Sequence, residues 1–109
     1  MRTNISKHIA NPTLFKEQIL LWSQQFVEVI VLEHPLSKIP DDFPECQILR
    51  GDITEREFIT SVKVEGIDAV LHLAAQSSGP RSFSIPEVDI KINILGTLNT
   101  IDWCLTNNI

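Results

Sequence analysis

The sequence predicts an α/β domain in which helices lie on both faces of a small, mostly parallel sheet, so that the fold has three layers. Two patterns support this. Helical and strand-like segments alternate along the chain in the order helix, strand, loop, strand, helix, strand, helix. The strand-like segments are short and mostly apolar, and the β-branched run at residues 27–32 is typical of a parallel strand that is buried on both faces. With 109 residues the chain has the length of one domain, and no linker or internal repeat divides it.

The first helix is expected at residues 12–25. Asn11 followed by Pro12 is typical of a helix N-terminus, where asparagine caps free amides and proline fits the first turn. Directly after this helix, the apolar run at residues 27–32 predicts a buried parallel strand, which ends at Glu33. One face of the helix is apolar, at Phe15, Ile19, Trp22 and Phe26.

The middle of the chain predicts a loop, a strand and a short helix. Residues 35–45 hold three prolines, which favour a loop, and a second strand follows at 46–49. Thr54 and Glu57 fit the capping box, a helix start in which a threonine and a glutamate three residues later bond each other's main-chain amides. The helix is expected to end at Gly66.

A third strand is expected at residues 68–75, and it ends in small side chains. Residues 76–86 are rich in serine, glycine and proline and predict a loop. Pro86 then opens a long helix that extends to about residue 106. Two overlapping apolar rows predict that this helix is covered on two sides. The rows are Val88, Ile92 and Leu95, and Ile94, Leu98, Ile101 and Leu105.

Composition excludes several classes of protein. Fourteen acidic residues against 9 Lys+Arg give a formal charge of -5, which argues against a nucleic-acid partner. Cys46 and Cys104 have neither CxxC nor Cys/His spacing, so no metal site and no disulfide framework is expected. No segment approaches 18 consecutive apolar residues, so no membrane span is expected either. The protein is therefore expected to be soluble and cytoplasmic.

Three segments, in this order and at these spacings, resemble the extended short-chain dehydrogenase/reductase family, the nicotinamide-dependent sugar-nucleotide epimerases and dehydratases. They are residues 49–54 (LRGDIT), 70–78 (VLHLAAQSS) and 93–99 (NILGTLN). The stretch at 74–86 is most similar to members of the UDP-glucose 4-epimerase type. The resemblance covers roughly residues 27–109 and implies a truncated Rossmann-like fold, in which residues 1–109 form part of a nucleotide-binding domain.

The resemblance also implies a site for NAD at the strand ends. Glu33 corresponds to the acidic residue that holds the adenosine ribose hydroxyls, which favours NAD over NADP. Asp52 and Ile53 correspond to the pair that flanks the adenine. Leu73, Ala74 and Ala75 correspond to a strand end whose small side chains let the main chain approach the cofactor. Asn93 corresponds to a helix asparagine near the catalytic residues. Residues 77–82 correspond to the loop that faces the sugar nucleotide.

The same residues also have plainer interpretations. Acidic side chains such as Glu33 and Asp52 are common at strand ends, because the chain leaves the core there. Asn93 could cap or bridge within its helix, and Gly96 could permit close packing against the sheet. His72, inside an apolar strand, is expected to be a core histidine with its hydrogen bonds satisfied.

The sequence departs from the family at two chemical sites. The phosphate-binding glycines should lie near residues 9–15, about 20 residues before Glu33, but no glycine precedes Gly51. Residues 1–8 are also a poor match for the apolar central strand expected before that turn. The family's proton-transfer pair, a tyrosine and a lysine four residues later, has no counterpart, because the sequence contains no tyrosine.

Three functions remain open. The chain is a domain without activity of its own, a module that binds NAD or a nucleotide sugar weakly, or the N-terminal part of an active NAD-dependent epimerase. A truncated sheet leaves an open edge and an apolar helix surface, so a homo-oligomer is expected through that edge or through the helix at 87–106. The expected contacts are Ile94, Leu98, Ile101 and Leu105.

Overall fold

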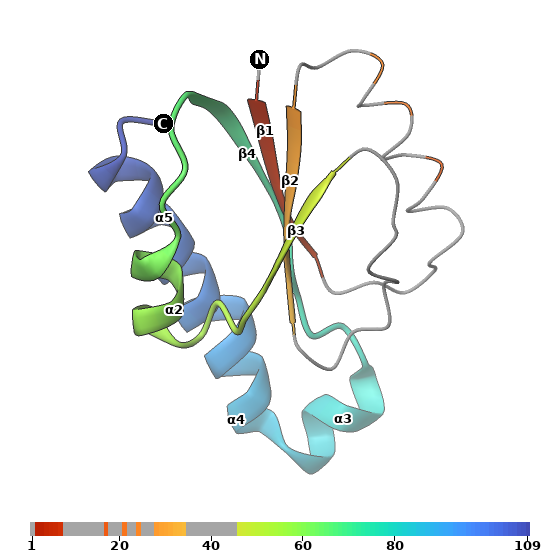
Figure 1. The fold of residues 1–109 in the computed structure, drawn as a ribbon. Coiled ribbons are helices and arrows are strands. Elements are labelled where there is room, and N and C mark those ends of the chain that lie inside the picture. The colour runs from red at the N-terminus through yellow and green to blue at the C-terminus, as the bar shows by residue number, and fades with distance from the viewer. Residues whose placement is uncertain (1, 8–16, 18–20, 22–23, 25–27, 35–45) are drawn as a thin grey trace.

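Four parallel strands form one sheet in the order β3-β2-β1-β4 (Figure 1). The computed structural model describes residues 2–7, 17, 21, 24, 28–34 and 46–109. Because every pairing is parallel, all four strands end at the same end of the sheet. This confirms the predicted α/β class and the small parallel sheet. The strands are β1 (Arg2–Lys7), β2 (Glu28–Glu33), β3 (Gln47–Arg50) and β4 (Ile67–Leu73).

The N-terminal segment supplies a central strand, so the expectation that residues 1–8 match such a strand poorly is wrong. β1 pairs with β2 on one side and with β4 on the other. The expectation rested on its polar composition, since central parallel strands are usually apolar. Hydrogen bonding of β1 to β2 on one side and to β4 on the other outweighs the low preference of polar residues for a central strand.

The other three strands lie within two residues of their predicted positions. In β2, Ile30 and Val31 have no exposed surface and Leu32 is nearly buried. This continuous burial is what its unbroken apolar run predicts for a strand covered on both faces.

The helix that follows β3 is α2 (Arg56–Ser61), and its predicted capping box is wrong. Glu55 occupies the cap position and makes no side-chain capping bond. Thr54 instead gives both its main-chain N–H and its hydroxyl to Asp52, which closes a tight turn after β3. The helix also ends before Gly66, whose φ of 68° lets it form the turn that leads into β4.

The segment predicted as a loop at 76–86 contains a further helix, α3 (Gly79–Ser84). Ser78 caps it by accepting a hydrogen bond from the main-chain N–H of Arg81. The signal was present in the sequence, because a serine before a proline in the first turn is typical of a helix start.

The long helix predicted from Pro86 to residue 106 is confirmed, with a widened middle. It consists of α4 (Pro86–Asp89), a π-helical segment η1 (Ile90–Gly96) and α5 (Thr97–Thr106). Its buried face is formed by Gly96, Asn99, Thr100 and Trp103, whereas both predicted apolar rows are partly or largely exposed. Cover on two sides is therefore wrong for the part of the chain that the structure describes.

Gly96 explains why small and polar residues form that buried face. A Cβ at Gly96 would stand 3.0 Å from Cδ1 of Ile53, so glycine lets the helix approach the segment after β3 closely. Gly96 thus permits close packing, as expected, but against Ile53 rather than against a strand of the sheet.

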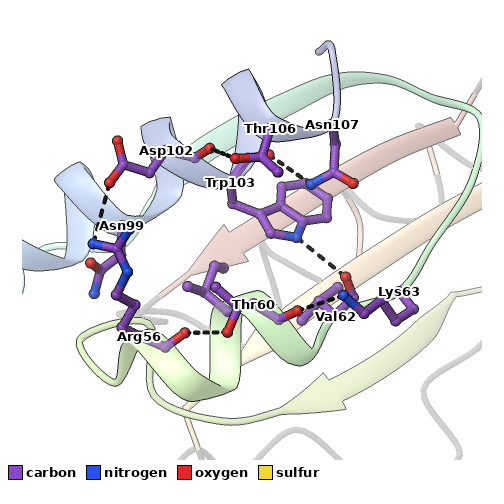
Figure 2. Close-up of a pocket in the computed structure, with 10 residues that line it drawn as sticks. Arg56, Thr60, Val62, Lys63, Asn99, Asp102, Trp103, Thr106 and Asn107 are labelled. Atoms are coloured by element: carbon purple, nitrogen blue, oxygen red, sulfur yellow. Dashed lines mark hydrogen bonds and ion pairs between the residues drawn. The ribbon is translucent and has the colours of Figure 1, made fainter.

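The core lies between the sheet and the helices α2 and α5, which lie side by side on one face of it (Figure 1). Trp103 fills the space between the two helices, and its Nε1 donates a hydrogen bond to the carbonyl of Val62 at 3.2 Å (Figure 2). The buried core residues are Leu32, Ile53, Ile59, Val62 and Trp103.

Two sequence predictions lie outside the described residues. Of the expected helix at 12–25, only Glu17, Leu21 and Gln24 are described, and these are helical and exposed. The expected loop at 35–45 and the positions expected for the glycine turn are not described. Within the described residues, no helix is long and apolar enough to cross a membrane, and no three His, Cys, Asp or Glu side chains gather as metal ligands.

Candidate functional site

The strand ends bring the predicted site residues toward one end of the sheet. In the strand register, Glu33 at the end of β2 is paired with Lys7 of β1 and with Arg50 of β3, and Lys7 is paired with Leu73 of β4. Asp52 follows two residues after Arg50. Because ligands of open parallel sheets bind beyond the carboxyl ends of the strands, this row is where a nucleotide site is expected.

Asp52 is held in a fixed position by its neighbours. Its Oδ1 accepts hydrogen bonds from the main-chain N–H of Thr54 at 2.8 Å and from the Thr54 hydroxyl at 2.7 Å. Its Oδ2 lies 3.5 Å from Nε2 of His34, the residue that follows β2. Asp52 thus links the ends of β2 and β3, and 32% of its side chain remains exposed.

The surroundings of Asp52 keep its carboxyl ionised. Partial burial raises its pKa, but the two hydrogen bonds from Thr54, together with the electrostatic influence of His34 and Lys91, outweigh burial and lower it below 3.8. The site therefore presents a permanent hydrogen-bond acceptor at neutral pH.

Ile53 is mainly a core residue. Its side chain is 8% exposed and packs in the core cluster. Its carbonyl accepts a hydrogen bond of 2.9 Å from Nδ2 of Asn99, a buried residue of α5. Asn99 was not predicted as important, yet it fixes the main chain directly after Asp52. Its signal in the sequence is a polar residue at a buried helix position, which normally has a hydrogen-bond partner.

The end of β4 is partly exposed. Leu73 and Ala75 are exposed, and Ala74 is half-buried against the core. The chain then turns at Gln76 toward α3, which lies with α4 beyond the carboxyl ends of the strands (Figure 1).

Asn93 holds the segment that follows β4. Its Oδ1 accepts from the main-chain N–H of Gln76 at 2.7 Å, and its Nδ2 donates to the Gln76 carbonyl at 3.0 Å. Asn93 therefore bridges between η1 and the end of β4, rather than within its own helix. Both the carbonyl oxygen and the amino group of the Asn93 side chain are therefore engaged in hydrogen bonds within the protein.

Gln76 was missed by sequence reasoning, although it organises the next turn. Its Nε2 donates to Oδ1 of Asp89 at 2.6 Å and to the hydroxyl of Ser82 at 3.1 Å, while its Oε1 accepts from the N–H of Ser78 at 2.6 Å. These bonds tie α3 and α4 to the segment that Asn93 clamps. A long amide side chain directly after a strand of small residues is its only signal in the sequence.

His72 connects β4 to the same network. Its Nε2 lies 3.0 Å from the Thr97 hydroxyl, which itself donates to the carbonyl of Asn93 at 2.7 Å. Because that hydroxyl has a single proton, it must accept from an Nε2–H, which leaves Nδ1 unprotonated. Burial lowers the pKa of His72, in agreement with a neutral ring.

The prediction for His72 is therefore only half right, because Nδ1 is buried and has no hydrogen-bond partner among the described residues.

A hollow of about 150 Å³ lies between α2 and α5 and is separate from the predicted site (Figure 2). Its wall includes Trp103 and the ion pair of Arg56 and Asp102, whose closest atoms are 3.5 Å apart. The hollow is too small for a dinucleotide, since ligand sites usually measure about 300–1,000 Å³. The strand-end row is therefore the better candidate.

Sequence comparisons place the chain beside enzymes that act on sugar nucleotides. The sequence model of the NAD dependent epimerase/dehydratase family matches residues 19–109. A dTDP-glucose 4,6-dehydratase of Streptomyces antibioticus is 34% identical over 74 residues, which are 68% of this chain and 22% of that protein. A putative UDP-glucose 4-epimerase of Methanocaldococcus jannaschii is 26% identical over 76 residues, 69% of this chain and 25% of that protein.

Solved structures agree on the fold. The UDP-glucose 4-epimerase of Thermus thermophilus, in complex with NAD, superposes with a TM-score of 0.79 at 24% identity. A UDP-galactose 4-epimerase superposes with a TM-score of 0.75 at 20% identity. Each comparison covers 100% of this chain and 35% of the other. The chain thus spans about a third of these structures, and a quarter or less of the curated relatives above.

Proposed function

Because this chain belongs to the NAD-dependent epimerase/dehydratase family, we propose that its 109 residues do not turn over a sugar nucleotide by themselves. The observation that carries the proposal is the absence of tyrosine from the sequence. The family resemblance implies a tyrosine and a lysine as the proton-transfer pair. Without a group of suitable pKa at that place, the proton has no carrier.

An assay of the purified chain tests this proposal. UDP-glucose and UDP-galactose are incubated separately with the chain and NAD, and the formation of the other sugar nucleotide is followed by chromatography. The expected result is a rate equal to that of a sample without protein. A rate that scales with the concentration of the chain would refute the proposal.

We further propose that the chain binds the adenosine part of NAD weakly. The residues fit this part of the cofactor, because Asp52 presents an ionised, partly exposed carboxylate beside the end of β2. Such a group can accept a hydrogen bond from the adenine amine, and Glu33 lies in the adjacent strand-end row, where the resemblance implies contact with the ribose.

The residues do not fit the pyrophosphate equally well. Tight binding needs glycines whose main chain can touch the phosphates at a helix N-terminus. The space beside Gly51 is filled by the Phe58 ring, and the space beside Gly96 by Ile53. With no glycine earlier in the sequence, we expect a dissociation constant in the millimolar range.

Calorimetric titration distinguishes binding from its absence. NAD, ADP-ribose and UDP-glucose are titrated into the chain, and NAD and ADP-ribose are expected to give similar weak heats because they share the adenosine end. Asp52→Asn is expected to abolish both heats. Glu57→Gln, an exposed substitution on α2 that also removes one negative charge, is the matched control and is expected to change neither. Absence of heat with all three ligands would overturn the binding proposal.

A further inference from the structure

The hollow of about 150 Å³ between α2 and α5 has no part in the nucleotide binding proposed above. Its floor is formed by three buried side chains, Ile59, Val62 and Trp103, which are 1%, 5% and 4% exposed. Polar side chains of both helices form its rim. An apolar cavity of roughly 150 Å³ is large enough for one benzene ring. The hollow therefore has the size for a small ligand that carries a single ring.

A buried polar atom at this hollow has no hydrogen-bond partner. Asn99 is 3% exposed, and its Nδ2 donates to the carbonyl of Ile53. Because a carbonyl can only accept, this bond fixes the orientation of the amide and turns Oδ1 away from Ile53. Within the part of the chain that the structure describes, Oδ1 accepts no hydrogen bond.

This Oδ1 is accessible from the hollow. Among the buried and half-buried residues that the structure describes, the only fully enclosed side-chain atom without a partner is Nδ1 of His72, so Oδ1 of Asn99 keeps some accessible surface. Asn99 lines the hollow, and the accessible surface therefore opens into it. A buried amide oxygen normally has a hydrogen-bond donor, and a ligand with an N–H group can supply one here.

The polar rim near Asn99 is balanced in charge. Nη1 of Arg56 lies 3.5 Å from Oδ2 of Asp102. Figure 2 shows these two side chains at the same end of the hollow as Asn99, with Lys63 at the other end. There, Nζ of Lys63 donates to the carbonyl of Thr60 at 3.0 Å. One end of the hollow thus combines the N–H donors of a guanidinium with the acceptor oxygens of a carboxylate and an amide.

We propose that this hollow binds an aromatic carboxamide, which is a planar ring that carries a neutral primary amide. The ligand carbonyl accepts from the guanidinium of Arg56, its amino group donates to Oδ1 of Asn99, and its ring contacts the apolar floor. A carboxylate on the same ring is disfavoured, because it sets acceptor oxygens against Oδ1 of Asn99 and against Asp102. An ammonium is disfavoured because Arg56 repels it.

Nuclear magnetic resonance of the purified chain tests this proposal. The indole N–H of Trp103 reports on the hollow, because it donates to the carbonyl of Val62 in the wall. The sequence contains two tryptophans, so the indole signal that remains in Trp22→Phe is that of Trp103. The probes are benzamide, benzoate and benzylamine, which share one ring and are neutral, negative and positive at pH 7.

Benzamide is expected to shift the Trp103 signal in a saturable manner, with a dissociation constant in the millimolar range that is usual for so small a ligand. Benzoate and benzylamine are expected to bind at least about tenfold more weakly. The absence of a saturable shift with benzamide at about 20 mM, which nearly saturates a millimolar site, would overturn the proposal. Equal affinity for the three probes would also overturn it, because contact with the ring alone would then explain binding.

The substitution Arg56→Gln tests the guanidinium. The Arg56 side chain is 70% exposed, so the core is expected to stay intact. Affinity for benzamide is expected to fall at least about tenfold, and benzylamine is expected to become the best of the three ligands, because Arg56 no longer balances the charge of Asp102. An unchanged order of the three probes would overturn the proposed contacts.

Arg81→Gln is the matched control for this substitution. It removes the same side chain from an exposed position on α3, outside the hollow, and is expected to leave all three affinities unchanged. None of the probes contains adenosine or phosphate, so their binding and the binding of NAD near Asp52 succeed or fail independently. Asp52→Asn is accordingly expected to leave the affinity for benzamide unchanged.

Discussion

At the level of single residues, Gly51 fixes how closely α2 approaches the end of β3. A Cβ built on Gly51 would overlap the ring of Phe58, whereas one on Gly79, at the start of α3, would meet no atom within 4 Å. The two glycines therefore have different roles, and only the first is required by packing.

Substitution of these glycines gives a paired prediction. Gly51→Ala is expected to lower the free energy of unfolding by about 1–3 kcal/mol, because the Phe58 ring must shift. Gly79→Ala is expected to change it by less than about 1 kcal/mol. Both values come from urea denaturation followed by circular dichroism. Equal effects of the two substitutions would contradict the packing argument.

Asp52 gives a prediction about pH. Its pKa in the folded chain lies below 3.8, so its ionised form stabilises the fold at pH values above the unfolded pKa. That contribution is lost as the pH falls through the folded pKa, which places the window below about pH 4. Asp52→Asn is therefore expected to lower the melting temperature at pH 7, and its effect is expected to shrink progressively as the pH is lowered below about 4. If the difference in melting temperature between the unmodified chain and Asp52→Asn stayed constant over this pH range, the charge of Asp52 would not be the cause of the stabilisation.

At the level of elements, the long C-terminal helix packs on the rest of the fold through a face that combines small, polar and aromatic residues. Gly96 and Asn99 approach Ile53 after β3 and Trp103 lies in the core, while the predicted apolar rows are partly or largely exposed. Periodicity correctly predicted the length of the helix. It could not predict which face is buried, because here close main-chain approach and a buried amide hydrogen bond outweigh apolar content.

The two hydrogen bonds between Asn93 and the main chain of Gln76 hold η1 against the end of β4. Asn93→Ala removes both hydrogen bonds to the main chain of Gln76, each contributing about 0.5–1.5 kcal/mol. Amide hydrogen exchange of residues 76–84 is therefore expected to become about tenfold faster, with no change in β2. Lys91→Ala, an exposed substitution in the same segment, is the control and is expected to leave exchange at 76–84 unaltered. Unchanged exchange in Asn93→Ala would show that the hydrogen bonds of Asn93 do not hold residues 76–84 in place.

At the level of the whole molecule, the sequence predicted the architecture better than the details of the site. Short, mostly apolar segments located β2, β3 and β4, and the clearest local pattern is that of β2, whose residues Ile30, Val31 and Leu32 are buried. β1 escaped prediction because its position depends on pairing with two distant strands. The roles of Gln76, Asn99 and Thr97 escaped for the same reason, since each depends on a partner far away in sequence.

The placement of β1 has a consequence for the order of folding. β2 and β4 do not pair with each other, and both are joined to the sheet through Arg2–Lys7. Of the four described strands, β1 is synthesised first, yet its second neighbour β4 is synthesised last. Closing so long a loop costs chain entropy and slows folding. The pairing of these four strands can therefore be completed only after β4 has been synthesised, and until then one edge of β1 is available for incorrect pairing.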